Sequence, residues 1–300
     1  MLILTQELPY STAHQVAEEF LGKTLSRSSL YRLTQHYGQA IAPALEQAPQ
    51  PLESADPVVY AMADGLMLLF DEGYKETKLG RIFARDALAA SPVAERGGQI
   101  GGSDYVAQAG SWPEFWAVWQ VHLAALVAQG KQLVFISDGV VWLHEQLKAS
   151  YPQAVLILDI YHVMHHLAQA AQAGISRPQV RKVWLKSMYK LLVSNRLDDV
   201  VSHLEGLSLA PDLWKRISNY LLSNRHRMDY EAYLKQGLCI GSGAIESANK
   251  AVVQSRLKRS GQRWSQAGAQ RVLNLRTCRM SGRWHLVQEK ITIEQRLIIT

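Results

Sequence analysis

The sequence predicts an α/β protein with a mixed sheet flanked by helices, and three observations support this prediction. Residues 58–63 form a short apolar run, residues 75–85 alternate in polarity, and residues 105–108 follow a glycine-rich stretch, which together predict three sequential antiparallel strands. From residue 111 onward, helix and strand patterns alternate. Residues 165–235 then carry helical patterns alone, and we expect an all-helical insertion there.

The alternating part begins with a long helix over residues 111–129, because Ser111 is a good cap residue and Pro113 fits a first helical turn. Further on, Ser242 is expected to cap a long basic helix that runs to Lys258. Between them, the patterns predict strands over residues 133–136 and 154–158 and helices over residues 141–148 and from Tyr161 onward.

The first 48 residues predict a small helical segment that resembles a helix-turn-helix. A helix is expected to begin at Ser11, and after a glycine a second helix runs from Ser26 or Ser28 through Tyr37. Three prolines within residues 46–57 indicate a linker to the main domain.

The second of these helices is the candidate reader of DNA. We expect Ser28, Arg32 and Gln35 on its exposed face, where a helix in the major groove presents its contacts. A plain helical hairpin with no DNA-binding role is the alternative.

Composition excludes several classes of protein. The hydrophobic fraction of 48% and charged fraction of 19% are typical of globular proteins, and no apolar run approaches the ~18 residues of a membrane span. The N-terminus has no signal-peptide pattern, so we expect a cytoplasmic protein with no membrane partner. Cys239 and Cys278 do not form a Cys-x-x-Cys pair, which argues against a zinc site or a disulfide framework.

Charge is distributed unevenly along the chain. The net charge is +6, and residues 241–283 hold many cations but a single acid, Glu246. This segment favours a polyanionic partner. Its basic residues are Lys250, Arg256, Lys258, Arg259, Arg263, Arg271, Arg276, Arg279 and Arg283.

Three acids stand where local structure would present them. Asp64 and Asp138 each precede a glycine at the expected end of a strand, and Glu246 lies in the first turns of the basic helix. Carboxylates are the ligands that Mg²⁺ prefers, and two such ions can assist a phosphoryl displacement. Each acid also has an ordinary interpretation: an Asp-Gly turn, or an ion pair between Glu246 and Lys250 at i+4.

Several motifs occur together in the order typical of one family. The stretch GLCIGSGAIESANKAVVQSRLKRSGQRWS at residues 237–265, with ISDGVVWL, LILDIYHVMHHL and RMDYEAYL, resembles the ISKra4 family of bacterial insertion-sequence transposases. The resemblance covers residues 64–276. It implies a Mutator-like DDE recombinase with an RNase H-like fold and a helical insertion before the last glutamate.

The resemblance also implies chemistry. The metal-binding catalytic triad would be Asp64, Asp138 and Glu246, with Mg²⁺ as the cofactor and Mn²⁺ as a substitute. The enzyme would cleave and join double-stranded DNA at element ends and at a target. It would act as a dimer or larger homo-oligomer on DNA and associate with the bacterial nucleoid.

Domain boundaries follow from these patterns. We expect a helix-turn-helix-like segment over 1–48, the first part of the catalytic core over 52–164, a helical insertion over 165–236 and the last part of the core over 237–300.

Auxiliary roles are expected for three residues. Asp159 and His162 resemble the Cys/Asp-x-x-His element of such transposases, although a packing motif between a strand and a helix is an equal alternative. Asn249 lies one helical turn beyond Glu246 and is expected near its face. The neighbouring His165 and His166 are interpreted as ordinary helix residues.

Basic residues beyond the glutamate are expected to bind DNA phosphates. With Arg32 from the N-terminal segment, this set is Lys250, Arg256, Lys258, Arg259 and Arg263. A solvated basic surface is the alternative. Trp264 could stack with Arg263 on an unpaired base, but a core tryptophan is the stronger interpretation.

Two other functions remain open at this stage. One is a catalytically silent DNA-binding protein descended from a transposase. The other is a nuclease of the same fold that cleaves DNA without joining it.

Overall fold

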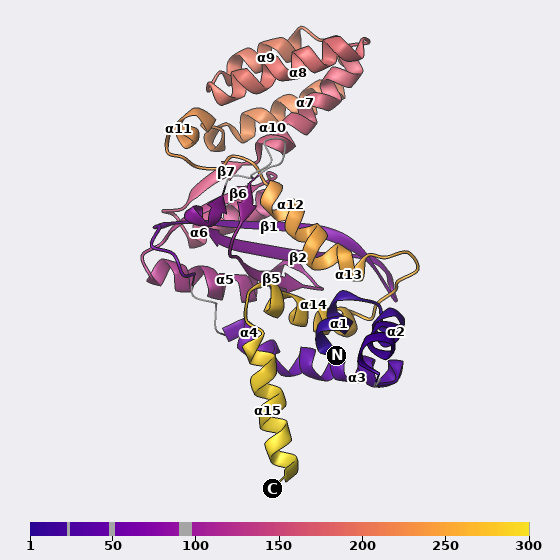
Figure 1. Cartoon of the computed structure of the whole chain (residues 1–300). Coiled ribbons are helices and arrows are strands. Elements are labelled where there is room, and N and C mark those ends of the chain that lie inside the picture. The colour runs from indigo at the N-terminus through magenta and orange to yellow at the C-terminus, as the bar shows by residue number, and fades with distance from the viewer. Residues whose placement is uncertain (23–24, 48–51, 90–97, 300) are drawn as a thin grey trace. The chain divides into compact units, whose positions relative to one another are not determined.

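The computed structural model describes residues 1–22, 25–47, 52–89 and 98–299 and contains a mixed five-stranded sheet (Figure 1). Its order is β5-β2-β1-β6-β7. The strands are β1 (Val58–Phe70), β2 (Gly73–Ala84), β5 (Asp104–Gln108), β6 (Gln132–Ser137) and β7 (Val155–Leu158). The first three pair antiparallel, whereas β6 and β7 are parallel. This arrangement, flanked by helices, confirms the predicted α/β class and is consistent with an RNase H-like fold.

Strand β1 is longer than the sequence predicted. It pairs with β2 continuously from Val59 opposite Ala84 to Phe70 opposite Gly73. The expected strand end at Asp64 is wrong, because Leu66, Leu68 and Phe70 bury alternate side chains and continue the strand. Asp64 therefore lies in the middle of a strand.

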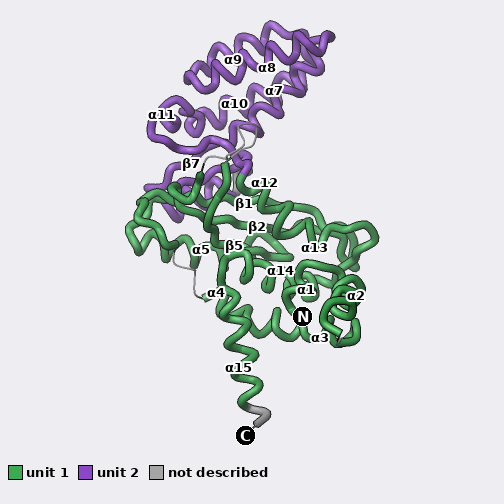
Figure 2. Tube along the Cα trace, in the orientation of Figure 1, with its two compact units in different colours: residues 1–133, 244–300 green, residues 134–243 purple. Residues whose placement is uncertain are grey.

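The chain forms two compact units, coloured green and purple in Figure 2. Unit 1 comprises Met1–Leu133 and Ala244–Thr300, and unit 2 comprises Val134–Gly243. These divisions differ from the boundaries expected from sequence, since the N-terminal helices cluster with the first strands. Residues 48–51 of the expected linker lie outside the described residues.

Helices of unit 1 come from both ends of the chain. They are α1 (Leu2–Glu7), α2 (Tyr10–Leu21), α3 (Arg27–Ala40), α4 (Ala42–Gln47), α5 (Trp112–Ala128), α12 (Gly243–Ala248), α13 (Ser255–Leu257), α14 (Gln266–Met280) and α15 (His285–Ile299). A π-helical segment, Asn249–Gln254, joins α12 to α13, and a small hairpin pairs β3 (Leu88–Ala89) with β4 (Gln99–Ile100). Helix α14 packs against both β5 and α3.

The N-terminal helices follow the predicted outline with local differences. Helix α2 begins at Tyr10 rather than at Ser11, and Gly22 ends it in the left-handed region with φ of 62°. Of the two serines predicted as possible caps of the second helix, Ser26 caps α3. Its side chain accepts a hydrogen bond from the backbone N–H of Ser29 at 3.1 Å.

Close packing of α3 on α14 overturns one expected DNA contact. A Cβ at Gly38 would lie 2.2 Å from the carbonyl oxygen of Arg271, so glycine is required there. This packing leaves Gln35 only 7% exposed, and the expectation that it faces DNA is wrong. Ser28 and Arg32 are exposed, as predicted.

Helix α5 forms as its cap residues predict. The side chain of Ser111 accepts from the backbone N–H of Glu114, and the Glu114 carboxylate accepts from the backbone N–H of Ser111, which completes a capping box. Phe115, Trp119 and Leu123 on one face are buried, so the helix covers part of the sheet.

Residues 165–235 form helices and no strand, as predicted, and they belong to unit 2. Their helices are α7 (Ile160–Gly174), α8 (Pro178–Val193), α9 (Leu197–Glu205), α10 (Pro211–Ser223) and α11 (Tyr230–Lys235), and unit 2 also contains α6 (Val141–Ser150) and β7. Met188, Val200 and Ile217 are fully buried among these helices and give the insertion its own core. Within the described parts of the chain, no helix combines the length and hydropathy needed to cross a membrane.

Candidate active site and nucleic-acid surface

A long-range hydrogen bond joins Asp64 to the late helical segment. The side-chain N–H of Asn249 donates to Asp64 Oδ2 at 2.7 Å, and Asp64 Oδ1 accepts from the backbone N–H of Gly65 at 2.8 Å. Asn249 is 3% exposed, and its Oδ1 has no partner within the described residues. Asn249 therefore holds the Asp64 carboxylate in one orientation.

Glu246 lies on the same helical segment as Asn249, in α12. Its side chain is exposed, while Ile245 and Ala248 are buried beneath it. Asn249 follows Glu246 by three residues, about one helical turn, and bonds to Asp64 of β1. The helical turn that carries Glu246 therefore lies near β1. Asp64 and Glu246 both belong to unit 1.

Arg81 anchors this segment, and the sequence prediction missed it. The side chain is 6% exposed, and Nη1 donates to the carbonyl oxygen of Ala244 at 2.8 Å while Nε donates to Ser103 Oγ at 3.0 Å. Burial lowers the pKa of the Arg81 guanidinium. A lone arginine in the buried half of β2 is the sequence signal that could have identified it.

Ser242 immediately precedes α12, at the position where the sequence predicts the cap, and its backbone N–H and hydroxyl both donate to Asp159. Asp159 is 3% exposed and accepts four hydrogen bonds: from the backbone N–H groups of Tyr161, His162 and Ser242 and from the Ser242 hydroxyl at 2.7 Å. Both carboxylate oxygens are used to cap α7 and to fix residue 242. The geometry thus favours the packing interpretation of the Asp-x-x-His element.

Asp138 follows β6 in unit 2, at the end of a strand as predicted. Its side chain is exposed, and its backbone oxygen accepts from the Tyr220 hydroxyl at 2.9 Å. Gly139 has φ of 99°, and a Cβ there would lie 3.0 Å from the Tyr220 ring, so a larger residue is excluded. Burial, reinforced by the Asp138 charge, raises the pKa of Tyr220.

His162 belongs to an aromatic cluster that joins α7 to α10. Its ring centroid lies 5.0 Å from that of His166, which in turn lies 4.2 Å from that of Tyr220. Burial, with the nearby charges of His162, Arg216 and His165, lowers the pKa of His166 to about 4. His166 is therefore a neutral packing residue at pH 7, as its ordinary interpretation predicts.

The depressed pKa of His166 predicts a pH-dependent stability. The unfolded chain binds a proton near pH 6.5 and the folded chain only near 4, so the unfolding free energy falls as the pH drops through this window. Urea denaturation at pH 7, 6, 5 and 4 should show this fall, and His166→Gln should reduce it. His203→Gln, which changes an exposed histidine of α9, should leave it unchanged. Equal pH profiles for wild type and His166→Gln would contradict the assignment.

The predicted phosphate-contacting residues fall into two groups. Those exposed in unit 1 are Arg32, Lys250, Lys258, Arg259 and Arg263. They remain available to a polyanion, although Arg259 also donates to the carbonyl oxygens of Ser255 and Glu7.

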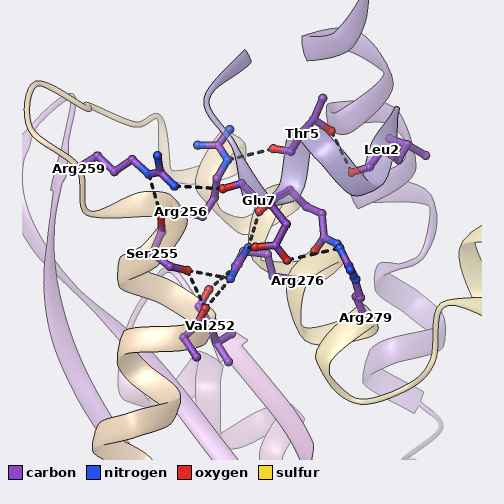
Figure 3. A network of polar contacts seen from close by, with 11 residues as sticks. Leu2, Thr5, Glu7, Val252, Ser255, Arg256, Arg259, Arg276 and Arg279 are labelled. Carbon is purple, nitrogen blue, oxygen red and sulfur yellow. Dashed lines mark hydrogen bonds and ion pairs between the residues drawn. The ribbon is translucent and has the colours of Figure 1, made fainter. Parts of the chain in front are cut away.

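Arg256 differs from the expectation. It is 1% exposed, and Nε donates to the carbonyl oxygen of Thr5 at 2.9 Å (Figure 3). The N-terminal helices cover it, and burial lowers the pKa of the guanidinium to about 10. Its proposed role as a direct phosphate contact is therefore corrected to a structural one.

The Trp264 side chain is buried in the protein. It is 8% exposed, and its indole N–H donates to the carbonyl oxygen of Leu257 at 3.0 Å. It also pairs with Phe70 at the end of β1 through a parallel bridge. The core interpretation of this tryptophan is supported.

The chemistry of the three acids suits a hard divalent cation. All are carboxylates, and beside Asp64 the unpartnered amide oxygen of Asn249 is a further oxygen of the kind that Mg²⁺ accepts. Asp64 and Glu246 belong to unit 1 and Asp138 to unit 2. Among the residues that the structure describes, no three His, Cys, Asp or Glu side chains are already gathered as a metal-binding group.

Comparison with known proteins gives little further guidance. No protein-family model matches the chain. No curated protein matches it either. Among solved structures, the Drosophila P element transposase strand transfer complex aligns with a TM-score of 0.32 and 12% identity, covering 97% of this chain and 79% of that one. At this level of similarity, neither family nor function follows from the comparison.

Proposed function

We propose that this protein is a DNA transposase of the DDE type, similar to the ISKra4 family, which cleaves DNA at element ends and joins it to a target. The observation that carries the proposal is the link between Asp64 and the basic helical segment. Glu246 is the single acid among the cations of residues 241–283, and Asn249 of the same segment bonds to Asp64.

The proposed roles of the acids follow from their chemistry. Asp64, Asp138 and Glu246 would hold Mg²⁺, with Mn²⁺ as a substitute. When bound, such ions lower the pKa of an attacking hydroxyl and neutralise charge on the leaving oxygen. The side-chain N–H of Asn249 positions the Asp64 carboxylate through the 2.7 Å hydrogen bond, and the side-chain oxygen of Asn249 has no partner within the described residues.

The proposed reaction has two in-line displacements. Water attacks the phosphodiester at the element end and the 3′-oxygen leaves, and this 3′-hydroxyl then attacks a phosphodiester of the target, from which another 3′-oxygen leaves. No covalent enzyme intermediate is required. Because two DNA ends are joined to one target, we propose a homo-oligomer on DNA.

The exposed cations supply the proposed DNA surface. Lys250, Lys258, Arg259 and Arg263 lie on or just beyond the segment that carries Glu246, and Arg32 lies on α3. Contacts from these residues to phosphates give affinity that depends on salt, without base specificity.

The direct test is cleavage and joining of labelled duplex DNA that carries both flanking ends of the element. We expect nicked and joined products with Mg²⁺ or Mn²⁺ and none when EDTA removes the metal. A duplex of random sequence that carries the same label is the control substrate. Cleavage without joined products would favour a nuclease. Binding of the ends without cleavage in any divalent metal would favour a silent DNA-binding protein.

A further inference from the structure

A cavity of about 420 Å³ lies in unit 1 beside the exposed cations. Its walls come from five segments of the sequence: the start of α2, the first half of α3, Asp71 after β1, Arg256 of α13, and the residues just before and within α14. The lining side chains that matter are Tyr10, Tyr31, Arg256, Gln262, Arg263 and Trp264.

Aromatic rings and a guanidinium form the walls. The Arg256 guanidinium lies 5.2 Å from the centroid of the Tyr10 ring and 5.0 Å from that of Trp264. Tyr31 meets Tyr10 edge to face at 5.5 Å, and Tyr31 is 46% exposed. A flat, polarisable ligand would meet the exposed Tyr31 ring beside a guanidinium that the Tyr10 and Trp264 rings hold in place.

Two buried polar atoms of the residues that line this cavity have no partner within the described residues. They are Arg256 Nη2 and Gln262 Oε1. Buried polar groups are normally hydrogen-bonded, so a donor and an acceptor left unpaired around one cavity point to a ligand with both acceptors and donors on its edge.

We infer that this cavity receives one unpaired nucleobase of a bound DNA strand. A base offers a flat face for the aromatic walls and an edge with donors and acceptors for Arg256 and Gln262. Arg263 at the lining is exposed and can meet the phosphate of the same nucleotide, while the Asp71 carboxylate disfavours a phosphate inside. The inference rests on the proposed DNA-processing function for the source of the base.

The test compares duplexes of identical sequence that are fully paired, carry one bulged 2-aminopurine, or carry an abasic bulge. We expect the wild type to bind the base-containing bulge about tenfold more tightly than either control, equivalent to about 1.4 kcal/mol, and to quench its fluorescence. Tyr31→Ala and Gln262→Leu should each abolish the preference without changing affinity for the paired duplex. Tyr189→Ala, a tyrosine of unit 2 with 41% exposure, should retain the preference.

The outcomes separate this inference from the proposed function. Metal-dependent joining of paired DNA with equal affinity for all three duplexes would overturn the inference alone. A preference that persists in both cavity variants would also overturn it. If no DNA is bound, the proposed function fails, and titration with adenosine and guanosine monophosphates tests the base site alone. Nucleotide binding by the wild type that is lost in Tyr31→Ala would keep the base site, with a free nucleotide as its ligand. Absence of nucleotide binding would overturn the base site as well.

Discussion

Asp64→Asn will reduce the rate of metal-dependent DNA joining by at least about 10²–10³-fold, the loss typical when one charge-stabilising group is removed from an active site. The substitution keeps the shape of the side chain and its place opposite Leu79 in the sheet, but it removes the negative charge that a divalent cation needs. Asp138→Asn and Glu246→Gln should have effects of the same size. Single-turnover joining of labelled ends in Mg²⁺ measures all three.

Matched variants separate catalysis from folding. Asp212→Asn on α10 and Glu289→Gln on α15 change exposed helical acids in the same chemical way and should retain wild-type rates. Thermal unfolding of Asp64→Asn should match the wild type within a few degrees, because Asn249 can still donate to the amide oxygen at position 64. Full activity in all three triad variants would eliminate the proposed mechanism.

Local sequence patterns sufficed for most elements of the fold. Helix α5 could be predicted because its capping box lies within four residues, and β6 and β7 because short apolar runs in a parallel pair are buried on both faces. The length of β1 could not be predicted from local patterns, because an Asp-Gly pair such as Asp64-Gly65 is typical of a turn. Pairing with β2 over the whole strand outweighs this local preference.

The candidate site depends on contacts that local patterns do not encode. Asn249 bonds to Asp64, which lies 185 positions earlier in the sequence. Asn249 itself belongs to a π-helical segment, which the ordinary spacing of apolar residues in an α-helix does not predict. Charge patterning cannot distinguish a solvated arginine from Arg256, which is buried only because helices from the other end of the chain cover it. The role of Arg81 was missed because its partner Ala244 lies 163 positions away in the sequence.

Arg276 illustrates how buried arginines stabilise the segment that carries Glu246 (Figure 3). The side chain is 1% exposed and donates to the carbonyl oxygens of Ala251 and Val252, which lie inside the π-helical segment. It also donates to the Gln6 carbonyl oxygen at 2.5 Å and to the Glu7 carboxylate at 3.0 Å, both on α1. One guanidinium thus joins α14, α1 and the segment between α12 and α13.

Arg276→Met should therefore lower the free energy of unfolding by about 3–5 kcal/mol, because each buried carbonyl oxygen that loses its donor costs about 1–3 kcal/mol. Methionine fills similar volume, but it leaves several buried carbonyl oxygens without a donor. Urea denaturation followed by tryptophan fluorescence measures the change. Arg279→Met is the matched control: this arginine bonds to the same Glu7 carboxylate but is 39% exposed, so its loss should cost less than about 1 kcal/mol. Equal small losses in both variants would show that the buried network does not hold the segment in place.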